Sequence, residues 1–526
     1  MTSRLHSLLL ATAHRQPERL ALLEGGRPVT YGVLALRVEA AAQGLVPLGL
    51  EVGARLAIWL PKTTDAIIAT FATSLAGGVF VPVHPGLKSA QVTHVLQDAG
   101  AAVLVTSASR LAQLAPRLEA LPQLRTVLLV DEAPLELVSL LPAGLRLLPF
   151  TALETQGSRA LPGLKADHVV ALFYTSGSTG QPKGVMLSHL NLCVGAASVV
   201  QYLDNGREDR LLAVLPLSFD YGFSQVTTGF LAGACVVLMD YLLPRDVVQA
   251  VTREGITGLA GVPPLWSALS TQEWPDAARK TLRYLTNSGG TMPQPVLARL
   301  RKQLPSTRVF LMYGLTEAFR STYLRPEEVD QHPDSIGRAI PNADVRVLRP
   351  DGEPCAVGEH GELVHAGPLV ALGYWNDAAA TALRFRAAPP FMQGARAVWS
   401  GDTVWADDEG RLHFVGREDG MLKSSGYRIS PVEVEEAAYA TGLVGDAVLV
   451  GVPHDTLGHE LVLFATEART GEHEPAALLA ALRTALPSHL VPASVFWRPA
   501  LPRTPHGKFD RVALTDEARR LTRPAR

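Results

Sequence analysis

The chain has 526 residues, 47% of them hydrophobic and 19% charged, so it is long enough for two or more folded domains and too apolar to be disordered. Its 48 basic and 50 acidic side chains give a net charge of −2, and no long basic run marks a nucleic-acid surface. The three cysteines lie far apart and favour neither a disulfide framework nor a zinc site, so we predict a reduced, cytoplasmic protein.

Short apolar runs alternate with amphipathic stretches over most of the chain, which favours parallel sheets covered by helices and therefore an α/β fold. The predicted strands are 56–60, 102–105, 127–130, 212–215, 236–239 and 309–312. The predicted helices between them are 91–98, 244–254 and 293–303.

Two uncharged stretches, Ala66 to Val83 and Gly222 to Met239, are 18 residues long and approach the length of a membrane-spanning helix. Glycines and a proline interrupt the first stretch, and polar side chains interrupt the second. A buried helix followed by a strand gives the same profile. We therefore predict no integral membrane segment.

The composition of the chain changes near residue 335. From Ser335 to Val415 it is rich in glycine and turns, which predicts a compact antiparallel β subdomain. The polar segment Gly416 to Gly420 is a plausible hinge, and the rest is long enough for a small α+β domain with helices at 431–441 and 475–486 and a strand at 447–452. We place the domain boundary between residues 418 and 419, giving domains 1–418 and 419–526.

The segment Tyr174 to Gly184 is the most informative stretch, with four Ser/Thr hydroxyls, three glycines and one lysine. It follows the apolar run 169–173, so a buried strand should end in a loop of backbone N–H groups, hydroxyls and one mobile cation. Such groups bind polyphosphates. No Gly-Lys-Ser/Thr triplet is present, so the loop is not a Walker A motif. We predict an ATP-binding loop of another kind, with a plain surface connection as the alternative.

Two further predicted strands end in glycine-containing segments, Asn287 to Thr291 and Tyr313 to Glu317. Ligands of α/β sheets bind beyond the carboxyl ends of strands, so the three ends could enclose one nucleotide. Glu317 would then be the carboxylate ligand of Mg²⁺, which prefers oxygen ligands beside phosphate. The alternative for Glu317 is a cap on the following helix.

Six motifs, in order along nearly the whole chain, resemble those of the AMP-forming acyl-activating ligases, the superfamily of acyl-CoA synthetases, luciferases and stand-alone adenylation enzymes. One such motif would be weak, but six in order are highly specific. They are 174–184, 313–317, 400–402, 416–419, 423–428 and 505–511. The resemblance implies a large N-terminal domain that binds ATP and the acid, followed by a small, mobile C-terminal catalytic lid domain.

The resemblance also implies how ATP is held. The Gly289-Gly290 turn and Tyr313 would border adenine, Asp402 would accept hydrogen bonds from the ribose hydroxyls, and Arg417 would donate to the same sugar. Gly314 and Thr316 belong to the same ATP site. The residues placed on the phosphates are Thr175, Ser176, Gly177, Ser178, Thr179, Gly180 and Lys183.

Lys508 is the residue on which the predicted chemistry chiefly depends. Alone, such a lysine is ordinarily a solvated surface charge, but in the family it enters the site from the small domain and bridges the acid's carboxylate and the α-phosphate. One ammonium can offset the repulsion of two anions. By the same resemblance, Asp419 is the hinge about which the small domain rotates, and Lys423 faces the site when a thiol replaces AMP to form a thioester.

The segment Leu217 to Gly222 resembles amino-acid adenylating enzymes, in which an aspartate binds the substrate's amine, more than fatty acyl-CoA synthetases. Asp220 and Tyr221 are therefore predicted to line the acid pocket, and Asp220 could alternatively cap a helix or pair with an arginine. Arg320 could bind a second anionic group of the acid, or form a salt bridge with Asp220.

The closest resemblance is to two subgroups, the exosortase-associated acyl-CoA ligases and the stand-alone prolyl adenylation enzymes. The leading hypothesis is an acyl-CoA synthetase that acts on a small-molecule carboxylic acid with ATP, Mg²⁺ and CoA. The alternatives are a proline-like amino-acid ligase that loads the phosphopantetheine of a separate carrier protein, and a non-catalytic nucleotide-binding relative. The presence of Lys183, Glu317, Asp402 and Lys508 argues against the last.

Overall fold

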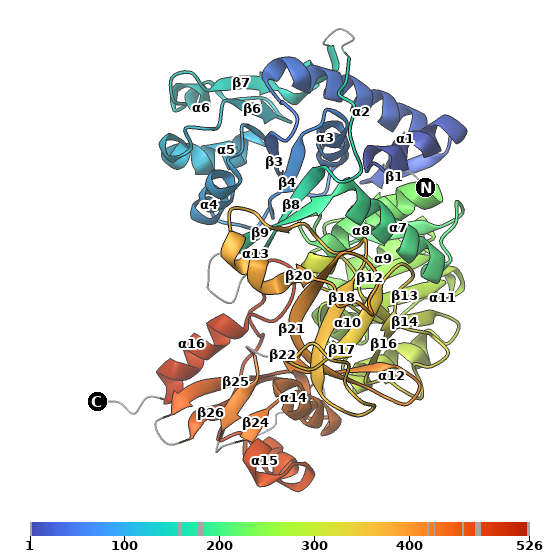
Figure 1. The fold of residues 1–526 in the computed structure, drawn as a ribbon, viewed down its shortest axis with the longest axis vertical. Coiled ribbons are helices and arrows are strands. Elements are labelled where there is room, and N and C mark those ends of the chain that lie inside the picture. Colours follow the sequence, from blue (N-terminus) through green and yellow to red (C-terminus); the bar gives the residue numbers. More distant parts are fainter. Residues whose placement is uncertain are drawn as a thin grey trace.

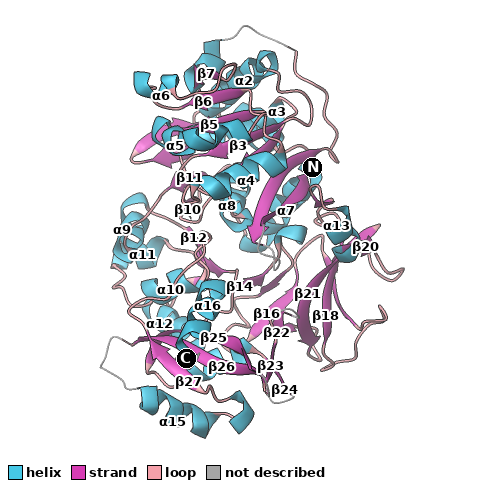
Figure 2. Cartoon of the chain, turned by 90° about the vertical axis from the view of Figure 1, so that its left-hand side faces the viewer, coloured by secondary structure: helices cyan, strands magenta, loops and turns pink. Residues whose placement is uncertain are grey.

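A computed structural model describes residues 3–155, 160–176, 182–417, 420–424, 427–454, 457–468 and 475–522. In Figure 1 a first sheet lies at the top, a long second sheet lies below it, and a third sheet lies at the bottom. Figure 2 shows helices on both sides of the upper sheets.

The first sheet has eight strands in the order β19-β9-β8-β4-β3-β5-β6-β7. Neighbours from β8 to β7 pair in parallel, whereas β9 and β19 are antiparallel additions. The strands β3 to β6 are buried along almost their whole length, as expected of parallel strands covered on both faces. The strands are β3 (Arg55–Trp59), β4 (Val79–Pro82), β5 (Val103–Thr106), β6 (Thr126–Leu129), β7 (Arg146–Pro149), β8 (Val169–Ser176), β9 (Pro182–Ser188) and β19 (Gly373–Tyr374).

The second sheet has 14 strands and joins a parallel part to the antiparallel β subdomain. Strands β10 to β14 pair in parallel, and β15 and β16 continue the hydrogen-bonded path to β22, β21, β18 and β17. The strands are β1 (Leu20–Glu24), β2 (Arg27–Thr30), β10 (Arg210–Ala213), β11 (Cys235–Leu238), β12 (Gly258–Gly261), β13 (Tyr284–Asn287), β14 (Arg308–Tyr313), β15 (Thr322–Leu324), β16 (Ser335–Ala339), β17 (Asp344–Leu348), β18 (Gly361–Ala366), β20 (Phe385–Ala387), β21 (Arg396–Ala406) and β22 (Leu412–Arg417).

The helices of the first 417 residues begin and end at local signals. Proline occupies the first turn of α9 and Gly255, with φ of 61°, follows its last residue, while Ser188 accepts a hydrogen bond from the Asn191 N–H at the start of α7. The α-helices are α1 (His6–Arg15), α2 (Tyr31–Leu45), α3 (Thr64–Leu75), α4 (Ser89–Ala99), α5 (Ala108–Leu114), α6 (Leu135–Ser139), α7 (His189–Leu203), α8 (Asp220–Ala232), α9 (Pro244–Glu254), α10 (Pro263–Leu269), α11 (Asp276–Thr281), α12 (Gln294–Gln303) and α13 (Ala378–Arg384). The short 3₁₀ helices are η1 (Val46–Leu48), η2 (Ala115–Ala120), η3 (Phe150–Thr155) and η4 (Thr316–Ala318).

The third sheet has five strands and a core of its own around Ile429, Val434 and Leu463. The predicted domain boundary, residues 418 and 419, lies outside the described residues. The elements are β23 (Leu422–Ser424), β24 (Tyr427–Ile429), α14 (Pro431–Ala440), β25 (Val444–His454), β26 (Gly458–Glu467), α15 (Pro475–Ala485), η5 (Ser488–Leu490), β27 (Ser494–Trp497) and α16 (Arg511–Thr522).

The predicted α/β fold is confirmed, with large mixed sheets in the N-terminal part and a small α+β C-terminal part. Each uncharged stretch folds as a helix followed by a strand, α3 with β4 and α8 with β11. Within the described residues, no helix has the length and apolarity to span a membrane.

Candidate active site

The segment predicted to bind phosphate begins in β8 and ends in β9, two antiparallel strands that pair through Thr175 and Lys183. Its residues Gly177, Ser178, Thr179 and Gly180 lie outside the described residues, and Ser176 is described by its backbone alone. The Lys183 ammonium lies 2.9 Å from a carboxylate oxygen of Asp377 and 5.6 Å from the ring centre of Tyr374. A cation therefore lies at the start of β9.

The two other predicted strand ends lie side by side, because β13 and β14 are adjacent parallel strands. At the end of β13, Gly289 has φ of 81° and the Asn287 side chain donates to the Gly290 carbonyl. Beyond β14, Glu317 lies in η4 and accepts a 2.7 Å hydrogen bond from the Tyr374 hydroxyl. Glu317 therefore does not stand before a long helix that it could cap.

Asp402 and Arg417 face each other on β21 and β22, with 3.6 Å between Nη1 and Oδ1. The Tyr313 hydroxyl donates to Oδ2 of Asp402, and burial together with this carboxylate raises the tyrosine's pKa well above its ordinary value. A small opening of about 40 Å³ is lined by Glu317, Tyr374 and Arg417 among others, so the ends of β14, β21 and β22 meet there.

Lys508 is carried by a tight turn whose two hydrogen bonds join Gly507 N–H to Thr504 and Thr504 N–H to the Lys508 carbonyl. Its alkyl stem packs on Gly289, where an added Cβ would lie 3.0 Å from Lys508 Cε. Its ammonium lies 5.5 Å from the centre of the Phe219 ring. A residue near the C-terminus is thus brought to the end of β13.

Four charged groups act on the Lys508 ammonium: Asp220, Asp402 and Glu317 attract it, and Arg417 repels it. Lys508 is an exposed residue, yet desolvation by the protein around its ammonium lowers its pKa despite the attraction of the carboxylates. The three carboxylates come from separate segments of the large domain. The structure therefore brings together Asp220, Gly289, Glu317, Asp402, Arg417 and Lys508, six of the residues predicted from sequence.

Asp220 and Arg320 form a buried ion pair, with 3.6 Å between Oδ2 and Nη1 and side chains 4% and 3% exposed. The guanidinium also lies 4.5 Å from the ring centre of Tyr221. Burial raises the pKa of Asp220, although the charges of Arg320 and Lys508 oppose this. Of the alternatives for Asp220 and Arg320, the salt bridge between them is the one that the structure contains.

A strained turn directs Arg320 toward Asp220. Phe319 has φ of 58° and ψ of −49°, and the Arg320 N–H donates to the Ala318 carbonyl at 2.6 Å, which defines a γ-turn. The Phe319 ring packs against Gly195, where an added Cβ would lie 2.4 Å from it. Such strain in a non-glycine residue persists only where packing imposes it and is frequent at functional sites.

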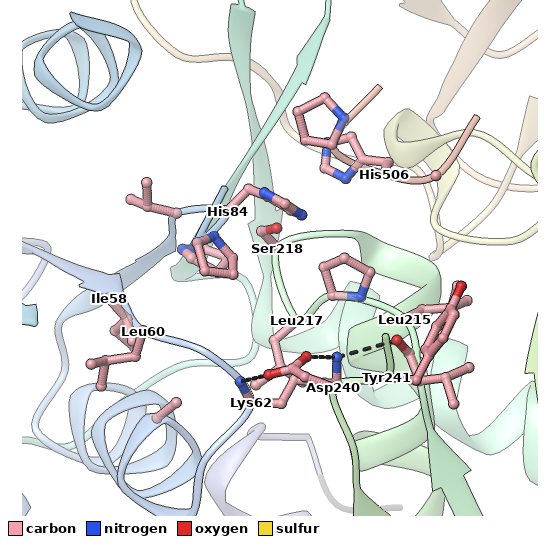
Figure 3. Close-up of a pocket in the computed structure, with 18 of the residues that line it drawn as sticks. Ile58, Leu60, Lys62, His84, Leu215, Leu217, Ser218, Asp240, Tyr241 and His506 are labelled. Carbon is pink, nitrogen blue, oxygen red and sulfur yellow. Dashed lines mark hydrogen bonds and ion pairs between the residues drawn. The ribbon is translucent and has the colours of Figure 1, made fainter. Parts of the chain in front are cut away.

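A largely apolar cavity of about 290 Å³ lies between both large sheets and the Lys508 turn. Its polar lining includes Lys62, paired with Asp240, and Lys62 also donates to the Val214 carbonyl at 3.2 Å. Figure 3 shows this pair on the opposite side of the cavity from His84 and His506.

Sequence reasoning missed Tyr374, Asp377, Phe219, His84 and Lys62. Phe219 lies inside the segment already singled out around Asp220, whereas no local signal marks the other four, which reach the site through contacts distant in sequence. Among the predicted residues, Lys423 is described by its backbone in β23 and Asp419 lies outside the described residues. In the part of the chain that the structure describes, no cluster of three or more His, Cys, Asp or Glu could hold a metal ion.

Comparisons with known proteins show the family to which the chain belongs. The AMP-binding enzyme family model matches residues 9–375, and that of the AMP-binding enzyme C-terminal domain matches residues 433–508. Feruloyl-CoA synthase from an Amycolatopsis species is 34% identical over 521 residues, covering 97% of both chains. The L-proline–[L-prolyl-carrier protein] ligase of Streptomyces coelicolor is 34% identical over 511 residues, 92% of this chain and 91% of the relative.

Among solved structures, ATP-bound MatB from Rhodopseudomonas palustris has a TM-score of 0.86 at 23% identity, covering 99% of this chain and 100% of the other. It shows that the folds are alike. The chain belongs to the AMP-binding enzyme family of adenylate-forming ligases, and it activates a carboxylic acid by adenylation.

Proposed function

We propose that this protein is an acyl-CoA synthetase, which converts a carboxylic acid and Mg·ATP to an acyl adenylate and then transfers the acyl group to the thiol of CoA. The observation that carries the proposal is that Lys508 packs against Gly289, with its ammonium among the carboxylates of Asp220, Asp402 and Glu317. The similarity to feruloyl-CoA synthase along 97% of both chains supports CoA as the acceptor.

In the first half of the reaction, a carboxylate oxygen attacks the α-phosphorus of ATP, the bond to the β-phosphate oxygen breaks, and pyrophosphate leaves. Lys508 screens the two anions as they approach, and the protein otherwise positions the reactants. The segment between β8 and β9, together with Lys183, would bind the β- and γ-phosphates. Asp402 and Arg417 would hold the ribose, with Tyr313 and Gly289 beside adenine.

Glu317 would hold Mg²⁺, which binds through one or two carboxylates together with phosphate oxygens and water. The Glu317 carboxylate, which accepts a hydrogen bond from the Tyr374 hydroxyl, fits that donor set. The ion supplies charge neutralisation at the phosphates when bound.

In the second half, the thiol loses its proton, its sulfur attacks the acyl carbon, and the bond to AMP breaks. We assign Lys423 to this step and Asp419 to the hinge about which the small domain moves between the halves, because both residues lie in segments that resemble motifs of the family. The small domain has a hydrophobic core of its own, which is consistent with its rotating as one unit.

The second candidate function is loading of proline or a similar amino acid onto a separate carrier protein. It is favoured by the 34% identity to a prolyl-carrier protein ligase and by Asp220, whose carboxylate could bind an amine. The Arg320 pair weighs against it, because the guanidinium already balances that carboxylate. Asp220→Ala should abolish activity only with an amine-bearing substrate, and full activity on a plain acid would eliminate the amine role.

ATP–pyrophosphate exchange with fatty, aryl and amino acids tests the function. We expect exchange with a non-amino carboxylic acid, followed by acyl-CoA formation when CoA is added. Lys508→Ala should lower exchange by about 100-fold or more, because one preorganised charge contributes that much to a transition state, while ATP binding by calorimetry stays near the wild-type value. Unchanged exchange in Lys508→Ala would remove the lysine from the mechanism, and exchange with amino acids alone would favour carrier loading.

A further inference from the structure

His84 bridges the large domain and the turn that carries Lys508. It follows β4, and its Nδ1 accepts a 3.0 Å hydrogen bond from the Gly86 N–H. The ring lines the same cavity as Pro505 and His506 of the turn that carries Lys508. Because Nδ1 accepts a hydrogen bond, it carries no proton, so the neutral imidazole has its proton on Nε2.

A chain of rings continues from His84 to the Lys508 ammonium. The His84 and His506 ring centres are 5.8 Å apart in an edge-on arrangement, and His506 lies 5.3 Å from Phe219. The Phe219 ring in turn lies 5.5 Å from the lysine nitrogen. Figure 3 shows His84 and His506 on the same side of the cavity. Each step is an aromatic or cation–π contact between the two parts of the molecule.

We propose that His84 is a positioning residue for adenylation, which holds the lysine-bearing turn against the large domain while the carboxylate and ATP react. The inference rests on the proposed role of Lys508. A residue of the large domain, far in sequence from the nucleotide-binding motifs, then determines what fraction of the molecules has Lys508 in the active site.

The charges around the two rings give this contact a pH dependence. Lys62, Asp240 and His506 face His84, while His84 and Lys508 face His506. Burial, aided by the neighbouring cations, lowers the pKa of His84 to about 4 and that of His506 to about 3. A histidine released to solvent titrates near ~6.5. The docked state binds fewer protons, so docking weakens as the pH falls from ~6.5 toward 4.

Two variants of His84 separate the contact from its titration. His84→Asn keeps the hydrogen bond from Gly86, because an Asn side chain accepts from the residue two positions on, but it has no ring to pack against His506. We expect pyrophosphate exchange at pH 7.5 to fall about tenfold. His84→Phe keeps a ring against His506, so pyrophosphate exchange should fall only about threefold. Because phenylalanine has no titrating nitrogen, the exchange rate of this variant should decline less steeply than that of the wild type between pH 7 and pH 5.5.

Thioester formation from supplied acyl adenylate and CoA is the matched readout, because it requires no attack on ATP. Both variants should retain the wild-type rate in this step. If both variants also lost thioester formation, His84 would support the large domain as a whole and the proposal would be wrong. It would be wrong too if both variants showed the wild-type rate of pyrophosphate exchange and the wild-type pH profile. If the wild-type protein exchanged with no acid, the proposed function would fail, and this inference with it.

Discussion

Two opposite charges, Asp220 and Arg320, are 4% and 2% exposed in the interior of the large domain. Taking such groups out of water costs more than their attraction returns unless hydrogen bonds complete the pair. Here Arg320 also donates to the Phe319 carbonyl at 2.8 Å and stacks on Tyr221, while its Nη2 has no hydrogen-bond partner among the described residues. The guanidinium thus retains hydrogen-bonding capacity beside the predicted acid pocket.

Removing one charge of this pair should lower the free energy of unfolding more than removing both charges. Arg320→Met leaves a buried carboxylate without its counter-charge and should lower the free energy of unfolding by roughly 3 kcal/mol. Adding Asp220→Asn should recover most of that loss, because no uncompensated charge remains. Urea unfolding of the single and double variants measures the difference. Equal stability of both variants would show that the two charges are not coupled.

At the scale of secondary-structure elements, Asp209 ties together the strand ends opposite the active site. It precedes β10 and accepts hydrogen bonds from Thr257 before β12 and from Arg283 before β13, at 2.6 Å and 2.7–3.0 Å. Burial alone would raise its pKa, but these bonds and that from the Gly206 N–H outweigh burial and lower it. The carboxylate thereby fixes the parallel strands whose other ends hold the glycine turns.

Asp209→Asn should therefore destabilise the large domain by about 2–3 kcal/mol at pH 7. The folded-state pKa lies below the unfolded value of ~3.9, so the wild-type advantage is present above pH ~4 and is lost as the pH falls below it. Chemical denaturation at pH 7 and pH 3.5 tests both statements. Asp65→Asn is the control, because its ion pair with Arg37 is one-third exposed and should contribute about 1 kcal/mol or less. Similar losses in the two variants would contradict the assignment.

Elements with local signals were predictable from sequence. The helix α9 has the predicted bounds because Pro244 and Gly255 mark its ends, and the β13 and β14 ends were found because glycine follows a buried strand. The β8–β9 hairpin was predicted only as a strand entering a loop, because antiparallel pairing of Thr175 with Lys183 depends on hydrogen bonds that no local pattern specifies.

The same limit applies to the candidate site. Glu317, Asp402 and Lys508 belong to recognisable motifs, whereas Tyr374 and Phe219 contribute through tertiary packing. The Tyr374 hydroxyl reaches Glu317 only because β19 pairs with β9, and Phe219 reaches Lys508 only when the small domain docks. Side chains that act across a fold carry no periodicity or spacing by which a sequence reveals them.

At the scale of the whole molecule, the small domain touches the large one beyond the lysine turn. The helices α14 and α12 pack together, which brings Glu436 close to Gln294 at the start of α12. Burial, followed by the charge of Glu435, raises the pKa of Glu436 to about 7. The docked arrangement therefore favours the protonated carboxyl.

Glu436→Gln should strengthen docking at alkaline pH. In the wild type the docked state binds the extra proton, so the contribution of Glu436 is present below pH ~4.5 and is lost as the pH rises through 7. Glutamine keeps the size and polarity of the side chain without the charge. Energy transfer between dyes on the two domains should show a variant-to-wild-type docking ratio of roughly fourfold at pH 5 and on the order of 100-fold at pH 8. A ratio independent of pH would exclude Glu436 from the contact.

The residues Tyr313, Asp402 and Arg417 all lie on one uninterrupted hydrogen-bonded sheet that runs from β14 through β16 to β21, whereas Lys508 is mounted on a separate body. Warming loosens contacts between bodies before it opens a covered sheet. A heated or mildly denatured enzyme would then still bind nucleotide while it no longer turned that nucleotide over, so loss of turnover would precede loss of ligand occupancy.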